Sequence, residues 1–149
     1  PMKGPRLSIQ GHSRFPGLPS RSMLSRWVAA AAGDDAEITL RFVGGVEGRR
    51  LNRDYRGRDY ATNVLTFAYA ETPSVVADIV LCVPVIRREA REQGKTARHH
   101  LAHLVVHGIL HARGFDHDTA APARVMEQRE AAILSCLGVA DPYRTHGRP

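Results

Sequence analysis

Alternating hydrophobic and polar residues predict strands in the first half of the chain. The clearest case is residues 37–43, where Ile38, Leu40 and Phe42 fall on one face. Residues 75–83 are almost continuously apolar, which is typical of a central strand buried on both faces. Four strands are predicted: residues 7–10 at a sheet edge, 37–43, 63–69 and 75–83. The last two are expected to pair as a hairpin across residues 70–74.

Apolar residues spaced three or four apart predict about five helices. They run from Ser20 as an N-cap to Gly33, over 46–55, over 85–93, over 97–112, and from Asp118 or Thr119 to Gly138. The last helix carries an apolar stripe that we expect in the core: Val125, Met126, Ile133, Leu134 and Leu137. The order of elements indicates an α+β or α/β domain, and we favour α+β, with one small, mostly mixed sheet of about four strands covered by about five helices. Residues 1–149 are expected to form a single domain.

Composition is ordinary for a globular protein, with 43% hydrophobic and 24% charged residues. No apolar run approaches the roughly 20 residues that span a bilayer, and no secretory signal pattern is seen at the N-terminus. Cys82 and Cys136 both lie in apolar runs, so both are expected to be buried and reduced. These features favour a cytoplasmic location.

The net charge is +6, and Lys3 and Lys95 are the only lysines among 21 basic residues. Arginine makes planar, two-pronged contacts with phosphate, so this excess of arginine and of positive charge favours a polyanionic partner. A solvated basic surface explains the same composition equally well. Charge by itself therefore leaves both interpretations open.

Three histidines near the end of the fourth predicted helix indicate a metal site. His107 and His111 are four residues apart and so lie on one helix face. Gly114 can end the helix in a left-handed conformation and turn the chain back. That turn would bring His117 to the same ion. Three neutral nitrogens leave one tetrahedral position open, which is the pattern of a catalytic rather than a structural zinc.

Other histidines leave a different arrangement open. His99 and His103 continue the same ladder, so His103 could be a ligand instead. We favour His117 because the Gly114 turn then has a clear purpose, and we expect His103 to support a ligand or pack against the core. His99 and His100 are expected near the exposed start of the helix. Zinc suits three imidazoles best, although nickel, copper and iron accept them too.

The spacing also matches the zinc peptidase pattern His-Glu-x-x-His-x-x-Gly-x-x-His. Gly108 stands where that pattern has its glutamate, the general base of the peptidase, so proteolysis is disfavoured. Asp116 is the nearest acidic residue, and either orients a ligand or takes part in acid–base catalysis. A metal-activated hydroxide beside arginines would suit a phosphodiester, because arginines neutralise charge on phosphoryl oxygens.

Several blocks of the chain, in order, resemble the bacterial YbeY endoribonucleases, a family once described as predicted metalloproteases. The blocks are Leu51–Asp59 with Thr62–Phe67, then Asp78–Cys82, then His103–His117, and finally Leu137–Gly138 with Asp141–Tyr143. The third is the most specific, and together they cover most of the chain. Two positions depart from the family pattern, with Ala61 where Pro is frequent and Ala77 where Gly is frequent.

The resemblance implies a zinc-dependent, single-strand-specific endoribonuclease acting in 16S ribosomal RNA 3′-end maturation and ribosome quality control. It implies one Zn²⁺ per chain on His107, His111 and His117, with Arg56 facing the metal cleft and acting at the phosphodiester. Without the resemblance, Arg56 is one of several arginines between residues 49 and 58. The expected partners are ribosomal RNA and the ribosome or small-subunit proteins, with no DNA and no membrane. A monomer or weak oligomer is expected.

Two other functions compete with this one. A metallopeptidase-like hydrolase would share the metal scaffold, and the missing glutamate argues against it. A ribosome-assembly RNA-binding factor would hold a structural zinc, which should have no open coordination position.

Overall fold

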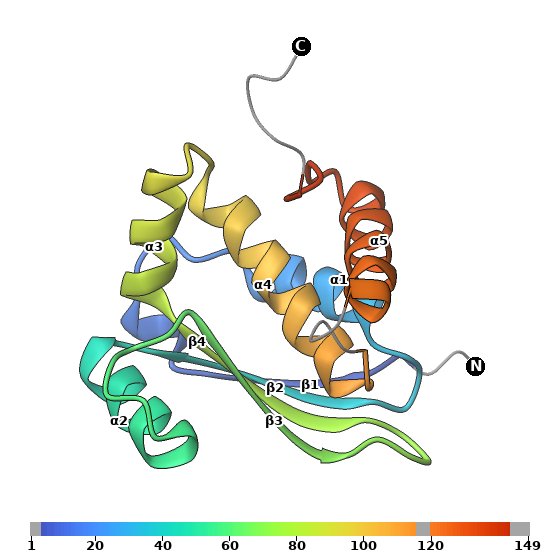
Figure 1. Cartoon of the computed structure of the whole chain (residues 1–149), viewed down its shortest axis with the longest axis horizontal. Coiled ribbons are helices and arrows are strands. Elements are labelled where there is room, and N and C mark those ends of the chain that lie inside the picture. The colour runs from blue at the N-terminus through green and yellow to red at the C-terminus, as the bar shows by residue number, and fades with distance from the viewer. Residues whose placement is uncertain (1–3, 116–119, 144–149) are drawn as a thin grey trace.

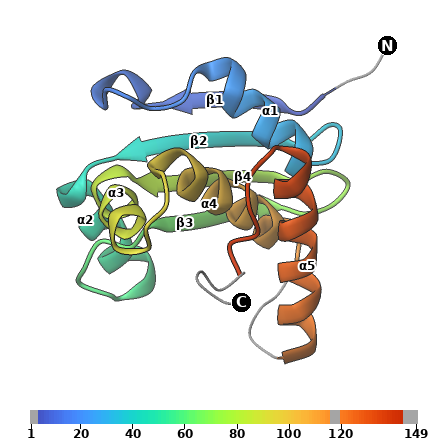
Figure 2. The same cartoon turned by 90° about the horizontal axis from the view of Figure 1, so that it is seen from above.

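The mixed sheet predicted from the sequence is present in the computed structural model, which describes residues 4–115 and 120–143. Its strands are β1 (Arg6–Gln10), β2 (Glu37–Val43), β3 (Val64–Ala70) and β4 (Val76–Cys82). They lie in the order β1-β2-β4-β3 (Figure 2). β1, β2 and β4 are parallel, while β3 and β4 form the expected antiparallel hairpin. The predicted edge position of β1 and central position of β4 are confirmed.

Five α-helices are found in the described residues, together with a short 3₁₀ turn at His12–Arg14. The helices are α1 (Arg21–Ala31), α2 (Gly45–Arg56), α3 (Val83–Glu92), α4 (Ala97–Ala112) and α5 (Ala120–Cys136). Helix α4 lies across the sheet, and α2 lies on the other side of the sheet (Figure 1). The predicted cap of α1 is confirmed, because the Ser20 hydroxyl accepts a bond from the Met23 amide at 3.1 Å. No helix in this part of the chain has the length and apolarity needed to cross a membrane.

The main core fills the space between the sheet and the helices around α4. Ile38, Leu40 and Phe42 face it together, as predicted, and are fully buried. A smaller cluster under α2 includes Leu65 and Val80 on the opposite face of the sheet. Two expectations are wrong: the thiol-bearing Cys136 is exposed, and so is Val125. Both lie on α5, which packs on one side only, so its outer face remains in solvent.

Gly108 brings α4 unusually close to the sheet. A Cβ at this position would lie 2.9 Å from Cγ2 of Ile79 and 3.2 Å from Oγ1 of Thr66. The Thr66 hydroxyl donates to the Gly108 carbonyl at 3.4 Å. A side chain at 108 would therefore enter the sheet, so the peptidase glutamate could not be accommodated here without moving the helix.

We expect Gly108→Ala to destabilise the protein. Alanine favours a helix over glycine by about 1 kcal/mol, whereas forcing a methyl group into a packed core costs roughly 1–3 kcal/mol. The net loss should be about 1 kcal/mol, measured by denaturant unfolding. Gly45→Ala is the matched control, because nothing lies within 4 Å of a Cβ there. Equal stability changes in the two variants would contradict the close approach.

Candidate functional site

A cavity of about 400 Å³ opens beside strand β3, between helices α2 and α4. Helix α2 supplies the last two residues of its final turn, α4 supplies two histidines, and β3 with the preceding loop forms the floor. The lining residues are Tyr55, Arg56, Thr62, Asn63, Val64, Leu65, Thr66, His107 and His111. We call this cavity the β3 cleft. It brings together three residues that the sequence singled out from two distant segments: Arg56, His107 and His111.

The two cleft histidines lie one turn apart near the end of α4. His107 is partly buried, whereas His111 is exposed. The helix ends at Ala112, and Gly114 has a φ of 95°, the left-handed conformation that the sequence predicted there. The third predicted ligand, His117, lies outside the described residues, as does Asp116.

Glu130 of α5 joins the histidines of α4 into a hydrogen-bonded group. Its Oε2 accepts from His103 Nε2 and from His107 Nδ1, each at 3.1 Å. Its Oε1 accepts from the Tyr143 hydroxyl at 2.7 Å. Burial by itself would raise the pKa of this fully buried carboxyl, but the bonds from His103, His107 and Tyr143 outweigh burial and lower the pKa to about 2.

The bond to Glu130 determines which nitrogen of His107 can bind a metal. When Nδ1 carries the proton and donates it to the carboxylate, Nε2 carries the lone pair. A histidine held in this way by a carboxylate is the usual supporting arrangement for a metal ligand. The donor chemistry of His107, beside His111 in the same cleft, therefore fits a metal ion.

A second set of donors could also hold a metal. Ligand atoms of His103, His107 and Glu130 all lie within 4.8 Å of one another. In that arrangement Glu130 would bind the ion directly, whereas in the predicted arrangement it would only orient His107. His103 thus belongs to the same cluster as His107, through a shared carboxylate.

Glu130 was not among the candidates from the sequence, although a signal for it exists. It follows Met126 by four residues and precedes Leu134 by four, so it falls within the apolar stripe of α5. A carboxylate on the buried side of a helix requires strong partners. The neighbouring histidines of α4 are those partners. They lie far from Glu130 in the sequence, so local sequence patterns do not reveal the pairing.

The prediction for His100 is wrong. It is buried rather than exposed, and its Nε2 lies 2.8 Å from Oε1 of Glu89. Burial lowers the pKa of His100 more strongly than the Glu89 bond raises it. The same Glu89 oxygen accepts from Asn63 Nδ2 at 3.0 Å. The His100–Glu89 pair therefore anchors Asn63, a residue of the β3 cleft.

The arginines of α2 differ in their partners. Arg49 makes a two-pronged contact with Asp59 at 2.7 and 2.9 Å. Arg53 pairs with Asp54, and Arg50 lies 3.8 Å from Glu47. Among residues 4–115 and 120–143, no carboxylate forms an ion pair with Arg56. Arg56 therefore lines the β3 cleft without a carboxylate partner from this part of the chain.

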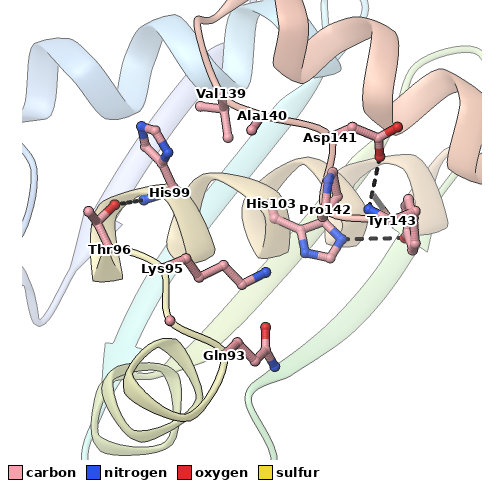
Figure 3. A pocket seen from close by; sticks show the side chains of 11 residues that line it. Gln93, Lys95, Thr96, His99, His103, Val139, Ala140, Asp141, Pro142 and Tyr143 are labelled. Atoms are coloured by element: carbon pink, nitrogen blue, oxygen red, sulfur yellow. Dashed lines mark hydrogen bonds between the residues drawn. The ribbon is translucent and has the colours of Figure 1, made fainter. Parts of the chain in front are cut away.

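A larger cavity, of about 610 Å³, lies between the start of α4 and the segment that follows α5. Lys95, His99, His103 and Tyr143 are among the residues around it (Figure 3). It contains neither Arg56 nor the histidines of the β3 cleft. His103 lies at its wall, with Nε2 3.4 Å from the Tyr143 hydroxyl. Of the residues bonded to Glu130, His103 and Tyr143 thus line this cavity, whereas His107 lines the cleft.

Sequence comparisons place the chain among known proteins. A family model described as "Endoribonuclease YbeY" matches residues 20–138. A protein of that name from Aromatoleum aromaticum is 56% identical over 125 residues, 84% of this chain and 81% of the relative. One from Methylibium petroleiphilum is 58% identical over 126 residues, 85% of this chain and 84% of the relative. One from Paracidovorax citrulli is 55% identical over 144 residues, 92% and 94% of the two chains.

The fold is also found in a solved structure. The solution structure of TM1509 from Thermotoga maritima matches with a TM-score of 0.56, covering 93% of this chain and 99% of that one. Sequence identity is 23%, so the likeness concerns the fold. The long, high-identity matches to named relatives and the family model agree with the resemblance carried by the histidine and arginine blocks. The chain therefore belongs to the endoribonuclease YbeY family.

Proposed function

We propose that this protein is a zinc-dependent endoribonuclease that cuts single-stranded RNA and acts in the cytoplasm in 16S ribosomal RNA 3′-end maturation and ribosome quality control. Its partners would be ribosomal RNA and the ribosome or small-subunit proteins. The convergence of His107, His111 and Arg56 on one cleft is the observation that carries the proposal. The relatives' name, endoribonuclease, supports the same reaction class.

In this proposal one zinc ion is held by His107, His111 and His117. Glu130 would accept a hydrogen bond from Nδ1–H of His107 and so keep Nε2 directed to the ion. When bound, zinc supplies a Lewis acid that lets water act as a nucleophile near neutral pH. The neutral imidazoles leave the ion its full positive charge, which suits an anionic substrate.

Arg56 would contact the phosphodiester that is cut. Its guanidinium can bind two phosphoryl oxygens at once, and it would stabilise the charge that develops there. Thr62, Asn63 and Thr66 give the cleft floor hydroxyl and amide groups suited to polar contacts with RNA. Anchoring of Asn63 by Glu89 would keep this floor in place.

The competing functions have less support. A peptidase of the matching pattern needs its glutamate at position 108, where a side chain would meet Ile79 and Thr66. A binding factor with a structural zinc would need a fourth protein ligand for the ion. The exposed position of His111 at a cleft of about 400 Å³ favours a site open to substrate.

The proposal is tested with purified wild type, His107→Ala, His111→Ala and His99→Ala. Each is given a defined single-stranded RNA and the same RNA annealed to its complement, with zinc per chain measured in parallel. We expect wild type and His99→Ala to hold about one zinc and to cut only the single strand. His107→Ala and His111→Ala should lose both zinc and cleavage, because each removes a ligand.

The outcomes separate the alternatives. Wild type that cuts RNA no better than both cleft variants would mean that the activity belongs to a contaminant. If His111→Ala keeps its zinc while His103→Ala and Glu130→Gln lose it, the ion is held by His103, His107 and Glu130 instead. Cleavage of a peptide by wild type, with RNA left intact, would support the metallopeptidase-like hydrolase instead.

A further inference from the structure

The β3 cleft contains an aromatic side chain that the proposed reaction leaves without a role. Of the Phe, Tyr and Trp residues in the described part of the chain, Tyr55 alone lines this cavity. It is 58% exposed, whereas the rings of Phe42 and Trp27 are buried in the main core. An exposed aromatic ring in a polar cleft offers a face on which another π-system can stack.

The ring is held from one side. Tyr55 packs against Phe67 of β3 with the ring centroids 4.2 Å apart and the planes tilted by 50°. Phe67 is itself packed on the small core cluster under α2. This support limits the orientations that the Tyr55 ring can adopt, so little conformational entropy would be lost when a second ring stacks on it.

Tyr55 and Arg56 are adjacent on the last turn of α2, and both line the cleft that holds His107 and His111. A guanidinium for a phosphate and an aromatic ring for a base thus come from two residues that line the same cleft. Proteins that bind single-stranded nucleic acid combine these two elements, because every base has a π-face that can stack. A paired base has its faces covered by its neighbours in the helix and cannot stack in this way.

We propose that Tyr55 is the stacking platform for one unpaired nucleobase of the RNA, next to the phosphate held by Arg56. The inference rests on the proposed function and deepens it, since it assigns the preference for single strands to a named side chain. Tyr55 binds substrate in this scheme and takes no part in the chemical step.

The experiment measures KM and kcat for a single-stranded RNA with wild type, Tyr55→Leu and Tyr55→Phe. Loss of one base stack should raise KM for Tyr55→Leu by about tenfold, with kcat within about threefold of wild type. Tyr55→Phe keeps the π-face and should stay within about twofold. The matched control is Tyr69→Leu, because Tyr69 is 65% exposed and does not line the cleft. Melting curves establish that all the variants are folded.

A second measurement separates stacking from mere packing on Phe67. The same RNA is prepared with a single abasic nucleotide at each position in turn. For wild type, one abasic position should raise KM about tenfold, and Tyr55→Leu should be insensitive at that same position. Equal penalties for both proteins at every position, or an unchanged KM for Tyr55→Leu, would overturn the platform while leaving the nuclease proposal intact. Wild type that cuts no RNA would overturn both.

Discussion

Glu130→Ala is expected to lower the melting temperature of the metal-free protein by about 10 °C. Three donors would lose their acceptor at once: His103 Nε2, His107 Nδ1 and the Tyr143 hydroxyl. Each buried donor that loses its acceptor costs about 1–3 kcal/mol, and each kcal/mol shifts the melting temperature of a chain of this size by about 2–4 °C. Scanning calorimetry after chelation measures the difference.

The control for this variant is Glu127→Ala, which removes a carboxylate from the same helix outside the hydrogen-bonded cluster. It should melt within a few degrees of wild type.

The pH dependence of the Glu130 effect gives a second check. The pKa of Glu130 lies at about 2, below the value of about 4.3 for an unfolded glutamate. Its stabilising effect is therefore complete above about pH 4.5 and is lost as the pH falls through 2. The gap between wild type and Glu130→Ala should narrow over that range; a constant gap would show that the carboxylate contributes through packing alone.

Arg56→Ala should lower kcat for RNA cleavage by about 10²- to 10³-fold while zinc content stays at the wild-type level. That magnitude is typical for removal of one group that stabilises developing charge in a transition state. Arg56 is suited to this role because it lines the cleft with His107 and His111. Single-turnover cleavage with excess enzyme measures the chemical step directly.

Two further variants make the assignment specific. Arg56→Lys keeps the charge but loses the two-pronged contact, so its kcat should fall between those of wild type and Arg56→Ala. Arg53→Ala removes an arginine of the same helix that pairs with Asp54 and lies outside the cleft lining. Its kcat should be unchanged. If Arg56→Ala instead raised KM with kcat intact, Arg56 would hold the substrate and its transition state equally.

Local patterns were sufficient for most of the secondary structure. The alternation at residues 37–43 and the apolar run at 75–83 became β2 and β4 because side-chain period and burial are properties of each segment alone. The predicted bounds of the histidine helix, 97–112, match α4, since Thr96 caps its start and Gly114 lies just beyond its end. The exposed face of α5 was harder to predict, because the apolar pattern of a helix does not reveal how much of that apolar stripe other elements cover.

The histidine spacing and the arginine block together determined the family and its candidate chemistry, because ligands on one helix turn are encoded by nearby residues. The tertiary structure decided which residues of other elements lie beside the histidines of α4. Only the packing of α5 on α4 places Glu130 beside His103 and His107, and only the sheet places Tyr55 and Arg56 at the same cleft as His111. Such contacts join residues far apart in sequence, and their geometry follows from how the helices pack on the sheet, which no local period records.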